Sequence, residues 1–301
     1  MTNPQSPLRA AELIIVGSAN VDLVVQVERH PRQGETVLGG DTSVFPGGKG
    51  ANTAVAGAKL GTRTSLLGAV GADAHGELLL TTLADAGVDT TLVSRVDAPS
   101  GAAYITVSEN GENSIVVSPG ANFRVGVADI DRAREAIAAA RVLFAVLEVP
   151  LPTVREAAAC AARAGVRVVL NASPVAPLDD ETLAVLDPLI VNQHEARVLL
   201  DKADGEADGE ADGEVLARGL LALGPRSVVV TLGAAGAVVA DAAGAVTLPA
   251  PEVDVVDTTG AGDSFAGSLA ARLAAGWSLA DAARDAVSIA ADAVTRRGAQ
   301  G

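Results

Sequence analysis

Cysteine and aromatic residues are scarce in this chain of 301 residues. The single cysteine, Cys160, excludes an internal disulfide and is consistent with a reducing, cytoplasmic environment. It lies in the alanine-rich run 156–164, which predicts a small buried side chain rather than a nucleophile. Aromatic residues make up only 2% of the sequence, and the small aliphatic residues that dominate instead suit close packing of helices on a sheet.

Long apolar runs and clustered basic residues are also missing. No apolar run reaches the ~20 residues that a membrane-spanning helix needs, and the polar start at residues 1–10 has no signal-peptide core. Lys and Arg do not cluster, and the formal net charge of −15 argues against a nucleic-acid partner. The composition therefore excludes membrane and nucleic-acid partners and leaves small-molecule substrates open.

Short apolar runs rich in β-branched residues alternate with amphipathic helical patterns along most of the chain. The runs predict buried strands at 13–16, 65–70, 142–146, 166–170, 189–191 and 227–231, with helices at 50–60, 76–86, 128–139, 151–164 and 214–223. This order is typical of an α/β fold, a doubly wound, mostly parallel sheet with helices on both faces. We expect one such domain over residues 11–301.

Two segments interrupt the alternation. Residues 23–27 with 35–45, and residues 102–108 with 113–117, predict hairpin strands with no helix between them. We expect these regions, about 22–46 and 101–118, to form a small β-strand lid that excludes water from a site at the edge of the main sheet. The lid strands carry more apolar side chains than a small flap can bury, which predicts a homodimer through them.

An acidic repeat occupies residues 204–214. Its spacing resembles a loose calcium loop, but the ligand order of an EF-hand is missing. We interpret the repeat as a solvated surface insertion.

A glycine-rich turn at residues 256–262 leads into an alanine-rich helical pattern. The backbone amides of Gly260, Ala261 and Gly262 would form an anion hole, which the helix dipole reinforces. Asp263 at the same point would repel a phosphate, so its presence indicates a general base that accepts a proton from an attacking hydroxyl group. The alternative is a simple turn in which Asp263 caps the helix.

Polar clusters follow the other predicted strands, at the edge where this class of sheet binds ligands. Asn20 and Asp22 point the same way in an extended chain and could bind vicinal hydroxyl groups, with an ordinary turn as the alternative. A second glycine cluster, at residues 46–52, is neither a P-loop nor a Rossmann motif. Its Gly48 permits close approach to a ligand, and Lys49 and Asn52 can donate hydrogen bonds. The remaining clusters are Glu148, Asn171, the pair Asn192 and Glu195 on one helix face, and the turn Thr231–Gly236.

Together with Gly34-Glu35-Thr36-Val37 and residues 294–300, these motifs occur in the order found in one known family. From Leu13 to Gln300 the chain resembles the ribokinase branch of the PfkB carbohydrate kinase family. The resemblance implies ATP-dependent phosphorylation of D-ribose to D-ribose 5-phosphate, with Asp263 as the general base.

The resemblance also implies a role for each motif residue. The sugar-binding residues would be Asn20, Asp22, Gly48, Lys49, Asn52, Glu148 and Asp263. The ATP-binding residues would be Asn192, Thr231, Leu232, Gly233, Ala234, Ala235, Gly236 and Gly262. Glu195 would help to place Mg²⁺ through water. The carbonyl groups of Asp257, Thr259, Ala293, Arg296 and Gly298 would hold K⁺.

Two positions depart from the family pattern. Val287 stands where relatives often have a polar residue near the adenine. Relatives also place a serine ligand of the K⁺ site one residue beyond Gly301, and we expect the Gly301 carboxylate or a water molecule to replace it.

Other functions remain as alternatives. A PfkB-family kinase acting on fructose, deoxyribose or a nucleoside is one, although Asn20, Asp22 and Glu148 favour a small polyol. A non-catalytic sugar-binding protein is another, and the intact Asp263 argues against it. A nicotinamide dehydrogenase would need a dinucleotide-binding fingerprint, which the sequence lacks.

Overall fold

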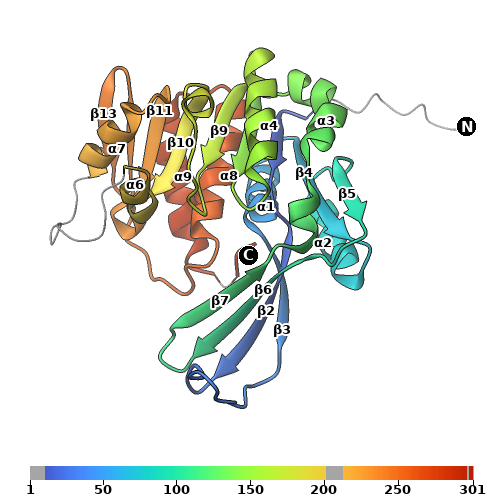
Figure 1. Cartoon of the computed structure of the whole chain (residues 1–301). Helices are drawn as coiled ribbons and strands as arrows, with labels where there is room; N and C mark the ends of the chain where they lie inside the picture. Colours follow the sequence, from blue (N-terminus) through green and yellow to red (C-terminus); the bar gives the residue numbers. More distant parts are fainter. Residues whose placement is uncertain (1–10, 201–212, 297, 301) are drawn as a thin grey trace, which may run out of the picture.

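Two β-sheets organise the chain, one of nine strands and one of four. The computed structural model in Figure 1 describes residues 11–200, 213–296 and 298–300. Gly301 and residues 204–212 of the acidic repeat therefore lie outside the described residues. In Figure 1 the four-stranded sheet projects below the larger one.

The nine-stranded sheet has the order β13-β12-β11-β10-β9-β8-β1-β4-β5. Its strands from β11 to β5 pair in parallel, whereas β12 and β13 add an antiparallel edge. The mostly parallel α/β sheet predicted from the sequence is confirmed. The strands are β1 (Leu13–Val16), β4 (Thr64–Gly71), β5 (Val93–Val96), β8 (Val142–Val146), β9 (Arg167–Asn171), β10 (Leu186–Asn192), β11 (Ser227–Thr231), β12 (Ala237–Asp241) and β13 (Gly244–Leu248).

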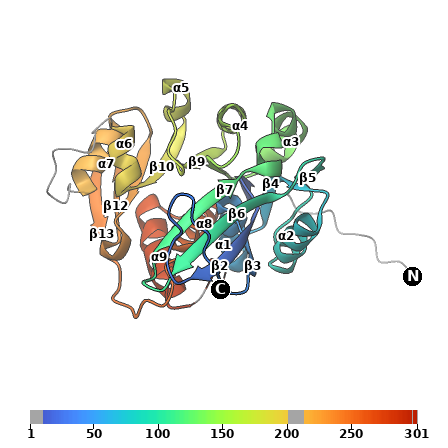
Figure 2. The same ribbon diagram turned by 60° about the horizontal axis from the view of Figure 1, so that its bottom comes forward.

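Helices cover both faces of this sheet, as Figures 1 and 2 show from two directions. One face packs against α3 (Val127–Ala139), α4 (Leu151–Arg163), α5 (Asp180–Leu183), α6 (Gln193–Leu199) and α7 (Gly213–Leu221). The other packs against α1 (Lys49–Lys59), α2 (Ala74–Asp85), α8 (Ala261–Ala274) and α9 (Leu279–Ala293).

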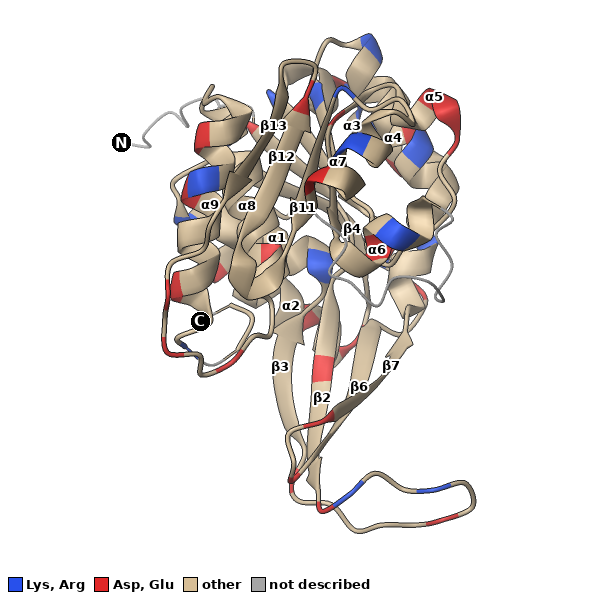
Figure 3. Ribbon diagram, turned by 90° about the vertical axis from the view of Figure 1, so that its left-hand side faces the viewer, with Lys and Arg blue, Asp and Glu red and all other residues tan. Residues whose placement is uncertain are grey.

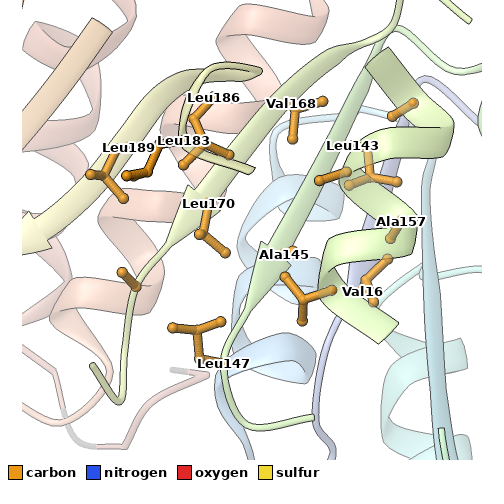
Figure 4. Close-up of a cluster of buried hydrophobic side chains, with 14 of the residues drawn as sticks. Val16, Leu143, Ala145, Leu147, Ala157, Val168, Leu170, Leu183, Leu186 and Leu189 are labelled. Carbon is orange, nitrogen blue, oxygen red and sulfur yellow. The ribbon is translucent and has the colours of Figure 1, made fainter. Parts of the chain in front are cut away.

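The alternation of side chains along each strand divides the core into two layers. In β1, Ile14 and Val16 join the layer under α3 and α4, whereas Leu13 and Ile15 join the layer under α1 and α8. Figure 4 shows part of the first layer, where side chains of β8 and β9 lie beside α4 and those of β10 lie beside Leu183 of α5. Both faces are buried, which explains why these strands are continuously apolar.

The four-stranded sheet, called the lid sheet below, has the order β3-β2-β6-β7. Its strands are β2 (Asn20–Val27), β3 (Ser43–Gly47), β6 (Gly101–Ser108) and β7 (Asn113–Ser118). Only three residues separate the end of β1 from the start of β2, so the lid sheet continues directly from β1, an interior strand of the main sheet. The prediction of extra strands outside the main sheet is confirmed.

The predicted strand over residues 35–45 is wrong for most of its length, because β3 begins only at Ser43. Gly34 has a left-handed φ of 79°, which turns the chain. After this turn the Glu35 carboxylate faces earlier residues of the connection. It accepts hydrogen bonds from Arg29 Nη1 at 2.7 Å and from the Arg32 amide at 3.0 Å. This connection projects beyond the strand ends in Figure 3.

The buried position predicted for Cys160 is confirmed in α4. Within the described ranges, no helix combines the length and apolar character needed to cross a membrane. In the view of Figure 3, basic and acidic positions are interspersed over the helices.

Candidate active site

Side chains from separate segments converge where β1 and β8 end and the lid sheet begins. Asn20, the first residue of β2, pairs with Gly47 of β3 and Gly101 of β6. The carboxyl ends of parallel strands are the edge at which such sheets bind ligands. The junction of the two sheets is therefore the expected position for a site covered by the lid sheet.

Asp263 is buried in the first turn of α8. Its Oδ2 accepts a hydrogen bond from Asn52 Nδ2 at 2.9 Å, and its Oδ1 lies 3.9 Å from Lys49 Nζ. The N-cap of α8 is Gly260, so the alternative in which Asp263 caps the helix is wrong. Its carboxylate instead faces two residues of α1.

Glycines bring the start of α1 against β2. Gly48, the N-cap of α1, has a left-handed φ of 92°, and an added Cβ there would lie 2.7 Å from the Asn20 amide nitrogen. An added Cβ on Gly47 would collide with the Asp22 carboxylate. Only glycine permits this contact, which places Asp22 beside the residues that open α1.

Three carboxyl groups and one amino group share the site. Burial, followed by the negative charges of Glu148 and Asp263, raises the pKa of Asp22 to about 6. Burial also raises the pKa of Asp263, while the positive charge of Lys49 and the Asn52 hydrogen bond act in the opposite direction. A buried carboxylate with a raised pKa accepts a proton more readily than an exposed one, which suits a general base.

Two buried residues that the sequence analysis missed hold the site together. Asn122, in the turn that follows β7, donates from Nδ2 to Asn20 Oδ1 at 2.7 Å and accepts from the Ala19 amide at 2.9 Å. The Ser18 hydroxyl donates a hydrogen bond to Glu148 Oε2, which also accepts from the Lys49 amide at 3.2 Å. Ser18 lies two residues before Asn20 in the sequence, whereas no sequence signal marks Asn122.

A second group of predicted residues lies at the ends of β10 and β11. Asn192 and Thr231 are direct partners in the parallel register of these strands. The sequence analysis expected Asn192 and Glu195 on one face of a helix. Instead, Asn192 precedes α6 as its N-cap. Its Oδ1 accepts from the Glu195 amide, and Glu195 Oε2 accepts from the Asn192 amide, both at 2.8 Å. In this capping box each side chain accepts a hydrogen bond from the backbone amide of the other residue.

The turn from Thr231 to Gly236 completes this second group. Thr231 Oγ1 donates to the Val191 carbonyl at 3.4 Å, and a short 3₁₀ turn, Gly233–Ala235, follows with all three residues exposed. The exposed backbone of this turn is available to a ligand beside Asn192.

The segment before α8 is tied to the last part of the chain. Asp257 Oδ1 accepts from the Thr259 amide and Oδ2 from the Gly298 amide, both at 2.9 Å. The Val294 carbonyl accepts from the amides of Val256 and Asp257. The structure therefore brings together the two segments predicted to share a cation. In the part of the chain that the structure describes, no group of three or more His, Cys, Asp or Glu side chains could hold a metal ion.

Comparison with known proteins gives matches along almost the whole chain. The family model described as pfkB family carbohydrate kinase matches residues 10–301. A ribokinase from Schizosaccharomyces pombe is 39% identical over 95% of this chain and 93% of its own length. A deoxyribokinase from Salmonella typhi is 34% identical over 96% of this chain and 94% of its own. The structure of Arabidopsis thaliana ribokinase complexed with ribose and ATP has a TM-score of 0.86 and 32% identity, with 97% of this chain and 95% of that chain covered.

Proposed function

Because the chain belongs to the pfkB family of carbohydrate kinases, we propose that it transfers the γ-phosphoryl group of ATP to D-ribose, forming D-ribose 5-phosphate. The observation that carries this proposal is the buried Asp263 at the start of α8, held by Lys49 and Asn52 and close to the carboxyl groups of Asp22 and Glu148. The similarity to named ribokinases supports ribose as the sugar.

The sugar would bind at the junction of the two sheets. Asp22 would accept hydrogen bonds from ribose hydroxyl groups, and Asn20 would donate one, because its Oδ1 is already engaged by Asn122. Gly48 would let the sugar approach the backbone. Lys49, Asn52 and Glu148 would complete the set, which suits a small polyol better than an apolar nucleobase.

Asp263 would accept the proton of the primary hydroxyl group of ribose. The hydroxyl oxygen then forms a bond to the γ-phosphorus as the bond to the bridging oxygen breaks and ADP leaves. The amides of Gly260, Ala261 and Gly262 would stabilise the charge that develops on the transferred group, at the positive end of the α8 dipole. Positioning and charge stabilisation would supply most of the rate enhancement.

The nucleotide would lie across the ends of β10 and β11. Asn192 and the turn from Thr231 to Gly236 would contact it, with Gly262 close to its terminal phosphate. Glu195 is engaged in the capping box, so it would act on Mg²⁺ only through water. This arrangement fits a hard cation that keeps several waters and takes most of its other ligands from phosphates, whose charge it neutralises when bound.

A K⁺ ion would be held by backbone carbonyl groups beside the anion hole. The carbonyl groups are those of Asp257, Thr259, Ala293, Arg296 and Gly298. The bonds from Asp257 to the Thr259 and Gly298 amides hold the two segments together and support this assignment. When bound, the cation would order the loop that leads into α8.

The lid sheets of two copies of the chain would pair in a homodimer. Six lid residues are large, apolar and 46–66% exposed, namely Val44, Phe45, Tyr104, Ile115, Val116 and Val117. Such a surface is typical of an interface between subunits.

Use of ATP as the phosphoryl donor supports a cytoplasmic location for the protein.

A panel of sugars tests the proposed substrate. ADP release would be measured with D-ribose, 2-deoxyribose, fructose and adenosine. We expect the highest kcat/KM with D-ribose. A preference for 2-deoxyribose would favour the second candidate, a deoxyribokinase, to which the chain is also similar. A preference for fructose or adenosine would refute the ribose assignment but not the kinase assignment.

Substitution of the base tests the mechanism. Asp263→Asn keeps the size of the side chain and removes the proton acceptor, so kcat should fall by at least ~10²-fold while ribose still binds. The matched control is Asp85→Asn at the exposed end of α2. Turnover of the Asp263→Asn variant within about threefold of the wild type would remove Asp263 from this role.

A further inference from the structure

Residues 298–300 pack across the loop before α8 and reach α1. The Gly298 amide donates to Asp257 Oδ2 at 2.9 Å. Ala299 lies so close to Gly260 that an added Cβ on Gly260 would be 2.6 Å from the Ala299 Cβ. The carbonyl of Gln300 accepts a hydrogen bond from Lys59 Nζ, at the end of α1, at 2.7 Å. The backbone of Gln300 is therefore fixed from two sides.

From this position the Gln300 side chain reaches the active site. Its Nε2 donates to Asn52 Oδ1 at 2.9 Å, and Asn52 Nδ2 in turn donates to Asp263 Oδ2 at 2.9 Å. An amide side chain donates only from its nitrogen and accepts only at its oxygen, and an ionised carboxylate only accepts. If Asn52 turned over, its NH₂ group would face the Gln300 NH₂ group and its oxygen would face the Asp263 carboxylate. Both contacts would then be lost.

We propose that Gln300 is a positioning residue for the general base: it fixes the orientation of the Asn52 amide, so that Asn52 always donates to Asp263. This inference rests on the proposed role of Asp263. It assigns to Gln300 an indirect effect on catalysis, because its side chain acts through Asn52 rather than on the sugar.

The Asn52 hydrogen bond stabilises the ionised form of Asp263 and so lowers its pKa against the effect of burial. The charged groups that face Asp263 are Lys49 of α1, which lowers the pKa, and Glu148 after β8, which raises it, with Asp22 of β2 close by. Loss of the Asn52 contact should therefore shift the acid limb of the kcat/KM profile to higher pH.

The Gln300→Glu variant tests this directly, because a carboxylate of nearly the same shape accepts hydrogen bonds but cannot donate them when ionised. Asn52 would then turn its NH₂ group toward residue 300. We expect kcat to fall about tenfold, the size of one hydrogen bond lost to a charged group. The acid limb should rise by roughly half a pH unit or more. Ribose KM should change less than kcat.

Two further variants separate the possible causes. Gln300→Met lacks both the donor and the new charge, and it should give a smaller change in the same direction. Gln33→Glu makes the same charge change in an exposed part of the connection between β2 and β3, and it should match the wild type. Thermal unfolding of each variant shows whether the protein remains folded at the assay temperature.

A double-mutant cycle distinguishes action through Asn52 from a general structural effect. If Gln300 acts through Asn52, Gln300→Met should cost almost nothing more in the Asn52→Ala background. Equal losses in both backgrounds, or a wild-type kcat and pH profile for Gln300→Glu, would overturn the inference. Failure of the proposed function would appear separately, as a wild-type protein that releases no ADP with any sugar.

Discussion

Substitution of Gly262 should separate the stability of the protein from its activity. Gly262 is exposed and is the second residue of α8. An added Cβ would meet no atom within 4 Å, and φ is not in the left-handed region. Among the glycines that the structure describes, no other combines both properties. Neither packing nor backbone conformation therefore requires glycine at this position, which leaves a ligand as the reason for it.

The expected effects of Gly262→Ala have opposite signs. Alanine is a better helix former than glycine by up to ~1 kcal/mol, and we expect about half of this in the first turn. The Cβ of a helical residue tilts toward the helix N-terminus, so the new methyl group would enter the proposed anion hole. Loss of one donor to a developing anion typically lowers kcat by ~10²–10³-fold. We therefore expect equal or higher stability and at least ~10²-fold lower kcat.

A control at the other end of the same helix should show the reverse. Gly276 follows α8 with a left-handed φ of 87° and open space around it. Gly276→Ala should cost ~1–2 kcal/mol of stability and leave turnover unchanged. The measurements are urea unfolding of the free protein and ribose-dependent ADP release. Wild-type turnover in the Gly262→Ala variant would refute the assignment of an anion hole to the start of α8.

Three further results are expected from the same site and from the lid sheet. The pKa of Asp22 rises from 3.8 to about 6 on folding, so the folded state binds more protons and the free energy of unfolding falls as pH rises through this window. At ~1.36 kcal/mol per pKa unit, Asp22→Asn should be up to about 3 kcal/mol more stable above pH 6, with no difference below pH 4, in urea titrations. Val116→Glu should convert a homodimer into monomers in sedimentation, and a monomeric wild type at micromolar concentration would contradict the proposed interface. Exchange of K⁺ for Na⁺ at constant ionic strength should lower kcat or raise the KM for ATP while leaving ribose KM unchanged, and equal activity in both salts would exclude a working cation site.

The sequence predicts the centre of the fold better than its edges. The strands β1, β8 and β11 match the predicted ranges residue for residue, because each is a continuous apolar run buried on both faces. The edge strands β5 and β13 were not predicted, since edge strands are partly exposed and their side chains lack this pattern. The strand β3 was placed too early, because the ion pair of Arg29 with Glu35 is not visible in the spacing of apolar residues.

The candidate site also contains some residues that the sequence predicts and others that it does not. Asp263 and the glycines around it have local signatures, since helix starts and left-handed turns favour particular residue types. The roles of Asn122 and Gln300 depend on contacts between distant segments, which no local pattern reports. The capping box of Asn192 and Glu195 has a local signature, but the sequence analysis placed its first residue one position too far into the helix.

The contacts that build the site also determine when it can form during folding. Asn52 and Asp263 are 211 residues apart, Asn52 and Gln300 are 248 apart, and Ser18 and Glu148 are 130 apart. Closing such long loops is entropically costly, and folding slows as contacts become more distant in sequence. The α/β units of the main sheet can pair between near neighbours before any of these three contacts exists. In a refolding experiment, helical circular dichroism should therefore recover before turnover does, which makes catalytic activity a reporter of the last tertiary contacts.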